Sequence, residues 1–172
     1  MNSIKSQHWS MADISEKKVS RRIAIAGGKI RLGEEAFSLL MDGKLPKGDP
    51  LAMAEIAGIQ AAKQTPSLIP LCHPISLNRV MIHSIPRPAD QSVELFCVAE
   101  IAEKTGVEME ALTGLSVALL TIWDLTKPVN AALEICNTRL LFKSGGKRGT
   151  WVHPDGMPAE AEAIVKELMV DG

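Results

Sequence analysis

The longest helical pattern in the chain, residues 110–127, places the strongest limit on its fold. Apolar side chains recur at helical spacing along one stripe, at Leu112, Leu115, Leu119 and Ile122, and small residues occupy much of the remaining surface. An apolar surface this broad has to be buried against both a sheet and a neighbouring element. The segment therefore favours a layered fold that combines helices with a sheet.

Strand-like alternation covers residues 19–32, where apolar side chains fall on odd positions before Gly27-Gly28 and on even positions after it. Ile23 and Ile25 mark the first half, and Ile30 and Leu32 mark the second. A two-residue hairpin turn would explain the change, and so would a bulge within one long strand. Both interpretations stay open at this point.

The remaining patterns complete an α+β order. A short helix is expected over 34–41, and a second helix begins with Asp49 as its cap and Pro50 at its first position. Further patterns predict antiparallel strands over 77–85 and 93–101 joined by a loop that contains Pro88, a strand over 134–142 and a helix over 158–169. This order predicts one domain over residues 1–172, with a ferredoxin-like antiparallel sheet and helices packed on one face.

Composition excludes several classes of protein. The 172 residues carry a net charge of −1 and 3% aromatic residues, so the chain lacks the basic field and the stacking platforms that nucleic-acid binding requires. A mean hydropathy of +0.09 with 23% charged residues fits neither a disordered nor a membrane-embedded chain. Three cysteines without paired spacing, and no apolar run of seven residues within 1–10, predict a cytoplasmic protein.

Polar residues gather in five short segments at the ends of the expected elements, where functional residues collect on a rigid scaffold. Together these segments supply four lysines, one histidine and four carboxylates, a combination suited to acid–base chemistry on an anionic substrate. The segments are 47–49, 71–74, 106–110, 123–127 and 143–147.

Two of these segments suit phosphate. Lys47 directly precedes a helix N-terminus, whose N–H groups and dipole attract anions. The loop over 143–149 is rich in glycine and basic residues but is not a nucleotide-hydrolase P-loop, because Leu141 and Arg148 occupy the positions of its first glycine and its hydroxyl. An ordinary capped helix start and a solvated surface turn are the alternative interpretations.

Titratable side chains mark two further places. His73 and Cys72 are adjacent, so in an extended chain they point to opposite faces and form no nucleophile–base pair. Asp124 and Lys127 lie three residues apart on the long helix, where each favours the charged form of the other; a surface ion pair is the alternative. No spacing typical of metal ligands occurs, so we predict no metal site.

Glu110 and Asp124 lie about 21 Å apart if the helix between them is continuous, because each residue adds 1.5 Å. One small substrate cannot touch both ends of one copy. Either the two ends serve different purposes, or a neighbouring subunit brings its opposite end alongside. We prefer the second interpretation, which predicts an obligate oligomer.

Residues 11–148 resemble the molybdenum cofactor biosynthesis protein C family, the cyclic pyranopterin monophosphate synthases. The resemblance rests on six segments that occur in the family's order: MADIS at 11–15, KGD at 47–49, AGIQAAK at 57–63, LIPLCHP at 68–74, KTGVEMEALT at 104–113 and KSGGK at 143–147. It implies a ferredoxin-like fold, assembled as a homohexamer of three dimers with sites at subunit interfaces.

The resemblance also implies a lyase reaction in molybdenum cofactor biosynthesis. The substrate is (8S)-3',8-cyclo-7,8-dihydroguanosine 5'-triphosphate, made by the pathway's radical GTP cyclase, and the products are cyclic pyranopterin monophosphate and pyrophosphate. No cofactor is evident from the sequence, and magnesium is left open as a companion of the pyrophosphate.

Position by position, the resemblance implies that Asp124 is the catalytic acid or base and Lys127 its close partner. Six residues would line the substrate, and four lysines are assigned to the triphosphate: Leu71, Cys72, His73, Glu108, Met109 and Glu110 for the first group, and Lys47, Lys63, Lys143 and Lys147 for the second. Pro128 departs from the family pattern and should restrict Lys127 to extended geometry. The tail, residues 151–172, lies outside the resemblance, and we expect no catalytic role for it.

Two other classes of protein could use similar loops. A non-catalytic ligand-sensing module would gain nothing from Asp124, Glu108 and Glu110 beside a polyanion, whereas a proton-transfer enzyme requires carboxylates. An RNA-binding α+β domain would need exposed aromatic residues on its sheet and a basic face. The sequence therefore favours the enzyme.

Overall fold

The computed structural model describes residues 9–170. Residues 1–8, which hold most of the segment tested for a secretory signal, and residues 171–172 of the tail lie outside the described part. Five helices, five strands and one short 3-10 turn form within 9–170. The helices are α1 (Glu34–Met41), α2 (Pro50–Lys63), α3 (Thr65–Leu68), α4 (Glu108–Thr126) and α5 (Ala159–Val170), and the turn is Pro88–Asp90. The strands are β1 (Ser20–Arg31), β2 (Arg79–Arg87), β3 (Ser92–Glu103), β4 (Glu134–Ser144) and β5 (Trp151–Val152).

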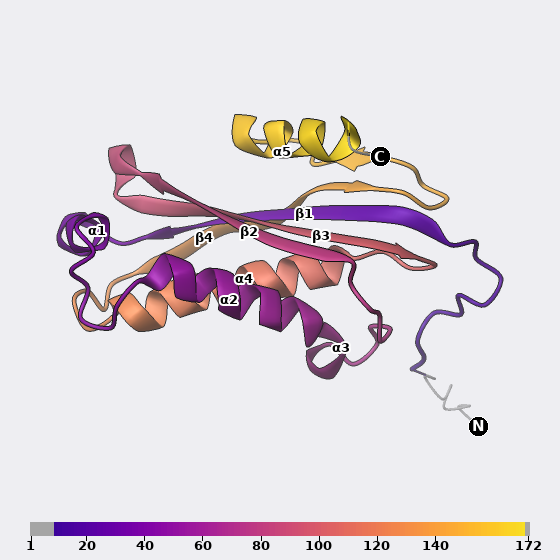
Figure 1. Ribbon diagram of the computed structural model, residues 1–172, viewed down its shortest axis with the longest axis horizontal. Helices are drawn as coiled ribbons and strands as arrows, with labels where there is room; N and C mark the ends of the chain where they lie inside the picture. The colour runs from indigo at the N-terminus through magenta and orange to yellow at the C-terminus, as the bar shows by residue number, and fades with distance from the viewer. Residues whose placement is uncertain (1–8, 171–172) are drawn as a thin grey trace, which may run out of the picture.

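The strands form one sheet in the order β2-β3-β1-β4-β5, and every neighbouring pair is antiparallel. The first four strands and the two long helices α2 and α4 give the order and pairing of a ferredoxin-like fold. Both helices lie on the same face of the sheet (Figure 1). The predicted fold class is therefore confirmed.

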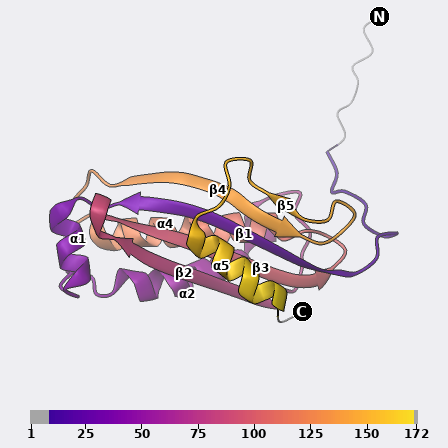
Figure 2. The same cartoon turned by 90° about the horizontal axis from the view of Figure 1, so that it is seen from above.

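The C-terminal helix α5 lies across the other face of the sheet (Figure 2). Ala161 and Leu168 of α5 are buried in a second apolar cluster with Ile23, Ile25 and Phe96 of the sheet. The prediction of helices on one face is thus correct for α2 and α4 but wrong for α5. It failed because the odd-numbered side chains of β1 are apolar as well, so this part of the sheet has two faces to bury.

Two-sided burial also explains the change of alternation at Gly27-Gly28. Strand β1 runs through both glycines and pairs with β3 from Ser20 to Arg31 without a shift in register, so the hairpin interpretation is wrong. The irregularities lie in the pairing with β4, at Ile25/Ala26 and at Gly27/Lys29. A β-carbon on Gly28 would lie 3.0 Å from Leu119 Cδ1, so this glycine lets α4 approach the sheet closely.

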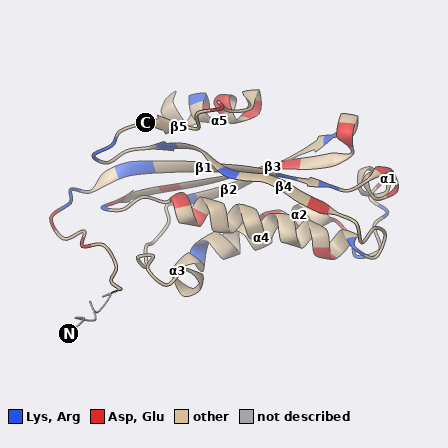
Figure 3. Cartoon of the chain, turned by 180° about the vertical axis from the view of Figure 1, so that it is seen from behind, with Lys and Arg blue, Asp and Glu red and all other residues tan. Residues whose placement is uncertain are grey.

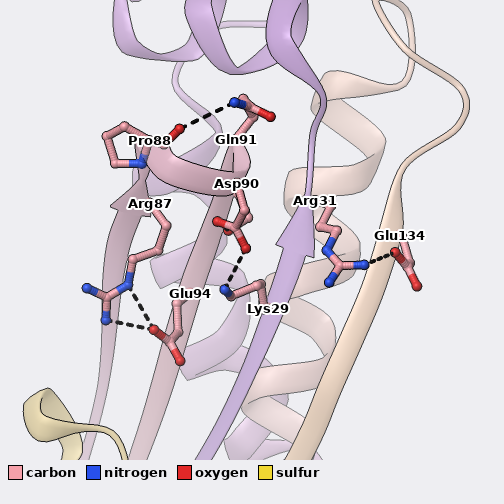
Figure 4. A network of polar contacts seen from close by, with 9 residues as sticks. Lys29, Arg31, Arg87, Pro88, Asp90, Gln91, Glu94 and Glu134 are labelled. Carbon is pink, nitrogen blue, oxygen red and sulfur yellow. Dashed lines mark hydrogen bonds and ion pairs between the residues drawn. The ribbon is translucent and has the colours of Figure 1, made fainter.

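Beyond α5, the same face of the sheet is charged rather than apolar (Figure 4). Lys29 pairs with Asp90 at 2.8 Å, and Arg31 pairs with Glu134 at 2.8 Å. Arg87 contacts Glu94 at 2.7 Å and also Glu160, in the first turn of α5, at 2.6 Å. These pairs balance one another's charge, and Arg87 joins α5 to the edge of the sheet.

Helix α4 is apolar enough over its 19 residues to meet the length and composition criteria for a membrane span. Its apolar side chains are instead buried against the sheet and α2, among them Leu115, Leu119 and Ile122. This is the arrangement expected of the core helix of a globular domain.

Helices α2 and α4 pack at a glycine contact. A β-carbon on Gly58 would lie 2.9 Å from the Gly114 carbonyl oxygen and 3.1 Å from the Ala118 β-carbon. We predict that Gly58→Val lowers the free energy of unfolding by about 1–3 kcal/mol, because the backbone oxygen has no room to move aside. Urea denaturation measures the change. Glu55→Ala, on the exposed side of α2, should stay within about 0.5 kcal/mol of wild type, and an equal loss in both variants would contradict the packing argument.

Candidate active site

The first group of predicted site residues meets at the C-terminal end of α4. Lys127 Nζ lies 2.7 Å from one carboxylate oxygen of Asp124, and Lys47 Nζ donates to the other at 3.0 Å. Lys47 arrives from the loop before α2, where the Asp49 side chain accepts from the N–H groups of Leu51 and Ala52, as predicted for a helix cap. The hydrogen bonds from Lys127 and Lys47 hold the pKa of Asp124 below its ordinary value. Asp124 is therefore an ionised carboxylate at neutral pH.

Pro128 does not force Lys127 into extended geometry, so that prediction is wrong. Lys127 has φ −55° and ψ −24°, which is right-handed helical, although the helix itself ends at Thr126. Its backbone N–H donates to the Trp123 carbonyl oxygen at 2.8 Å and continues the helical path by one residue. This hydrogen bond outweighs the preference imposed by the following proline and keeps the Asp124–Lys127 spacing helical.

A second group lines a hollow of about 230 Å³ beside the N-terminal end of α4. All six predicted substrate-lining residues border it: Leu71, Cys72, His73, Glu108, Met109 and Glu110. His73 Nε2 lies 2.9 Å from the Ala12 carbonyl oxygen. Because a carbonyl only accepts, Nε2 carries the imidazole proton in this contact. The contact ties the N-terminal segment to the wall of the hollow.

Glu110 is a buried carboxyl group, with 3% of its surface exposed. Burial raises the pKa of Glu110, and the nearby charge of Glu108 raises it further. Burial and the charge of Glu110 likewise raise the pKa of the Cys72 thiol. Glu110 and Cys72 thus favour their neutral forms, so the part of the wall that they form suits a neutral heterocycle better than a phosphate.

The buried position of Glu110 should reduce stability. A raised pKa means that the folded state disfavours the carboxylate, so stability falls as the pH rises above the ordinary pKa of 4.5. We predict that Glu110→Gln raises the midpoint temperature of unfolding by a few degrees at pH 7–8, with the gain vanishing below about pH 4. Calorimetry at both pH values measures this, with Glu162→Gln on the exposed side of α5 as the control. A gain that persists at low pH would contradict the charge argument.

A third set of residues forms a larger hollow of about 700 Å³ with basic walls. Lys143 and Lys147, two of the lysines predicted for the triphosphate, line it together with Lys17, Lys18, Arg22 and Arg148. Glu16 and Glu108 are the acidic residues of its lining. Six cations around one hollow make a site suited to a polyanion.

The basic hollow and the smaller hollow adjoin, because Gly106 and Glu108 line both. Lys143 Nζ donates to Glu108 at 2.7 Å across this boundary. Burial raises the pKa of Glu108, but the hydrogen bond from Lys143 and nearby positive charge outweigh it, so the pKa lies below its ordinary value. One elongated molecule could place a ring in the smaller hollow and an anionic tail in the basic one.

The predicted residues are therefore divided between two ends of the molecule. Asp124, Lys127 and Lys47 lie at one end of α4, and both hollows lie at the other; Figure 3 shows charged residues at the two ends of α4 and none along its middle. Lys63, in the last turn of α2, is exposed and lines neither hollow. The separation predicted for Glu110 and Asp124 is preserved, because α4 is continuous between them.

Sequence reasoning did not single out three basic residues of the larger hollow: Lys17, Lys18 and Arg22. Arg148 was included only as a member of the basic loop over 143–149, without a role of its own. A signal was present, since Lys17 and Lys18 follow the MADIS segment at 11–15 after one intervening residue, Glu16. Their distance in sequence from Lys143 concealed the relation. It arises because the start of β1 pairs with the end of β4.

Comparison with known proteins identifies the family of this chain. The sequence model of the MoaC family matches residues 11–146, which include every predicted site residue except Lys147. The chain belongs to the MoaC family. A relative named cyclic pyranopterin monophosphate synthase, from Chloroflexus aurantiacus, is 46% identical over 147 residues, which is 86% of this chain and 90% of the relative.

Further relatives carry the same name. Proteins with that name from Dinoroseobacter shibae and Rhodospirillum rubrum are 45% and 43% identical to this chain. The matches cover 81% and 82% of this chain, and 88% and 85% of the relatives. Within residues 9–170 of this MoaC-family chain, no group of three or more His, Cys, Asp and Glu side chains is placed to hold a metal ion.

Proposed function

We propose that this chain is a cyclic pyranopterin monophosphate synthase, a lyase of molybdenum cofactor biosynthesis. It converts the cyclised dihydroguanosine triphosphate to cyclic pyranopterin monophosphate and releases pyrophosphate. The observation that carries the proposal is a pair of adjoining hollows in a chain of the MoaC family: a smaller one lined by the buried Glu110 and by Cys72, and a larger one lined by six cations. This pair of hollows suits a heterocycle joined to a triphosphate.

The two parts of the site divide the chemistry. Formation of the cyclic phosphate requires a hydroxyl to attack the α-phosphate as pyrophosphate leaves, and cations stabilise the charge that develops on the oxygens. Lys143 and Lys147 are assigned to this task. Rearrangement to the pterin requires proton transfer during ring opening and closure, and Asp124 is assigned as the acid or base, with Lys127 and Lys47 holding its carboxylate.

Completion of this site requires a second copy of the chain. The Asp124 cluster and the hollows of one copy lie at opposite ends of α4, so a two-fold axis across the middle of α4 would bring the Asp124 cluster of one copy to the hollows of the other. Exposed apolar side chains on the outer surfaces of α2 and α4 suit such contact: Met53, Ile56 and Leu120. We propose this dimer as the unit of a homohexamer.

Three further assignments belong to the same proposal. The chain would receive its substrate from the pathway's radical GTP cyclase, because the substrate is the product of that chemistry. It would work in the cytoplasm, where its three free thiols are stable. It would need no cofactor of its own, and magnesium would accompany the pyrophosphate if the reaction uses it.

The decisive experiment is turnover by the purified protein. The protein is incubated with the cyclised dihydroguanosine triphosphate, and pyrophosphate is measured together with the fluorescent oxidised pterin. We expect both products to appear in equal amounts. Binding of the substrate without pyrophosphate release, in protein of confirmed oligomeric state with and without magnesium, would refute the enzyme and favour a ligand-sensing module.

A further inference from the structure

The glycine-rich loop after β4 is the tip of a hairpin rather than a free segment. Strand β5 pairs back onto β4 through Phe142 with Val152 and Lys143 with Trp151. The His153 N–H extends the ladder by donating to the Leu141 carbonyl oxygen at 2.9 Å. Both strands of this hairpin therefore hold the tip, residues 145–150, in place.

Close contact with β1 sets the position of the tip. Gly145 and Gly146 have φ of +95° and +74°, and a β-carbon on Gly145 would collide with the Arg21 carbonyl oxygen. A β-carbon on Gly146 would collide with the Arg22 guanidinium group. This approach, which glycine alone permits, places the next two side chains, Lys147 and Arg148, in the wall of the basic hollow.

Helix α5 fastens the far end of the hairpin segment. Its Ala161 and Leu168 are buried against the sheet. Arg21 Nη2 donates to the Leu168 carbonyl oxygen at 3.0 Å, and Arg87 pairs with Glu160. Residues 151–170 thus form a clamp, β5 with α5, whose two ends are tied to the sheet that carries Arg22.

Arg148 has the chemistry of a phosphate ligand. It is exposed, it lines a hollow with five other cations, and it forms no ion pair within residues 9–170. Its planar guanidinium group can donate two parallel hydrogen bonds to one phosphate. Arg148 lies beyond the residues that the family model matches, which end at 146.

We propose that Arg148 is a further phosphate-binding residue of the basic hollow and that the clamp, residues 151–170, positions it. The proposal rests on the proposed function in that the anion is taken to be the triphosphate of the substrate. A preorganised hairpin tip loses less conformational entropy on binding than a free chain end, so the clamp should act on affinity and leave the chemical step unchanged.

The first test compares Arg148→Gln and Arg148→Lys with wild type in the full chain. Two quantities are measured: steady-state turnover of the cyclised substrate, and calorimetric binding of inorganic tripolyphosphate. We expect Arg148→Gln to raise KM and the tripolyphosphate Kd by about 10- to 100-fold, with kcat changed by less than about threefold. Arg148→Lys should recover part of the loss. Lys166→Gln, on the exposed side of α5, is the matched control for charge and should change neither quantity.

The second test concerns the clamp. Leu168→Asp loosens α5, and His153→Pro removes the N–H that pairs with Leu141, so the two variants attack the clamp at separate points. Each should raise the tripolyphosphate Kd of the otherwise normal chain. In a chain that already carries Arg148→Gln, the factor by which each clamp variant raises the Kd should be at least about three times smaller, since the effects of contacting or coupled residues are not additive. Trypsin cleavage after Lys147 or Arg148 should be faster in both variants and slowed by tripolyphosphate.

The outcomes separate the claims. An unchanged Kd in Arg148→Gln would overturn the role of Arg148, even if wild type turns over the substrate. If each clamp variant raised the Kd by the same factor with and without Arg148→Gln, the positioning role of the clamp would be overturned. If Leu168→Asp loses its fold by circular dichroism, His153→Pro decides this point. Absence of turnover in wild type would remove the proposed function, while the tripolyphosphate measurements would still test Arg148.

Discussion

Asp124→Asn is expected to lower kcat by about 10²–10⁴-fold, the usual contribution of a general acid or base. Asn keeps the shape of the side chain and can still contact Lys127 and Lys47, but it cannot accept or return a proton. The loss should appear in kcat more than in KM, because the change removes proton transfer rather than a binding contact. Stopped assays of pyrophosphate and pterin fluorescence measure both quantities.

The pH dependence sharpens this expectation. Lys127 and Lys47 hold the pKa of Asp124 below its ordinary value of 3.8, so the carboxylate loses its charge only in more acidic solution. Wild-type kcat should therefore show no loss caused by Asp124 between pH 5 and pH 8. Lys47→Met should move the acidic limb of the profile toward neutral pH, because one of the two stabilising cations is removed.

A matched control tests whether loss of any surface carboxylate has the same effect. Asp155 forms an exposed ion pair with Arg139 at 3.2 Å and lies in neither hollow. Asp155→Asn should leave kcat within about twofold of wild type, as expected for an exposed ion pair. If Asp124→Asn retained wild-type kcat, the reaction would stand but Asp124 would lose its assigned role.

Mixing two inactive variants is expected to restore activity. Asp124→Asn damages the cluster at one end of α4. Lys143→Met removes a lysine assigned to the phosphate reaction beside the other end, where Lys143 contacts Glu108. Each variant alone should therefore lack a complete site. In a dimer with shared sites, a mixed pair carries one site with both changes and one site with neither. Random mixing should therefore recover about a quarter of wild-type turnover, since half of the dimers are mixed and each has one intact site.

Co-expression of the two variants gives the random mixture, whose turnover is measured before any selection. Isolating the mixed dimers by two different affinity tags should then raise the recovery to about half of wild-type turnover, because every dimer then has one intact site. A control pair, Asp124→Asn with Lys127→Met, places both changes in the same cluster, so mixing should recover nothing. Recovery in neither pair would mean that each site is built within one copy. Equal recovery in both pairs would point to exchange or contamination rather than shared sites.

Most of the fold could be predicted from local patterns. Helix α1 forms over the expected residues, Asp49 caps α2, and the strands differ from prediction by a few residues at their ends. Local rules work here because capping, helical spacing and alternation each depend on neighbouring residues. They failed at Gly27-Gly28 and at α5, where the outcome depends on which faces of the sheet are buried by distant segments.

Prediction of the site residues likewise succeeded for local motifs and failed for contacts between distant segments. The sequence indicated both ends of α4 and six of the ten residues that line the smaller hollow, because each lies in a compact motif. It did not indicate that Lys17, Lys18 and Arg22 share one hollow with Lys143. The backbone geometry of Lys127 was predicted wrongly from Pro128. The preference of a residue before proline for extended geometry was weaker than the hydrogen bond from the Lys127 N–H to the Trp123 carbonyl oxygen.

By itself, the amino-acid sequence determined the kinds of element, the residues able to perform the chemistry and the distance between the ends of α4. These follow from backbone geometry and from side-chain chemistry, which operate over a few residues. The tertiary structure alone decided which cations surround one hollow, how buried Glu110 is and that a C-terminal clamp holds the loop after β4. Those properties depend on strand pairing and burial between residues more than a hundred positions apart, such as Arg21 and Leu168, and no local pattern encodes them.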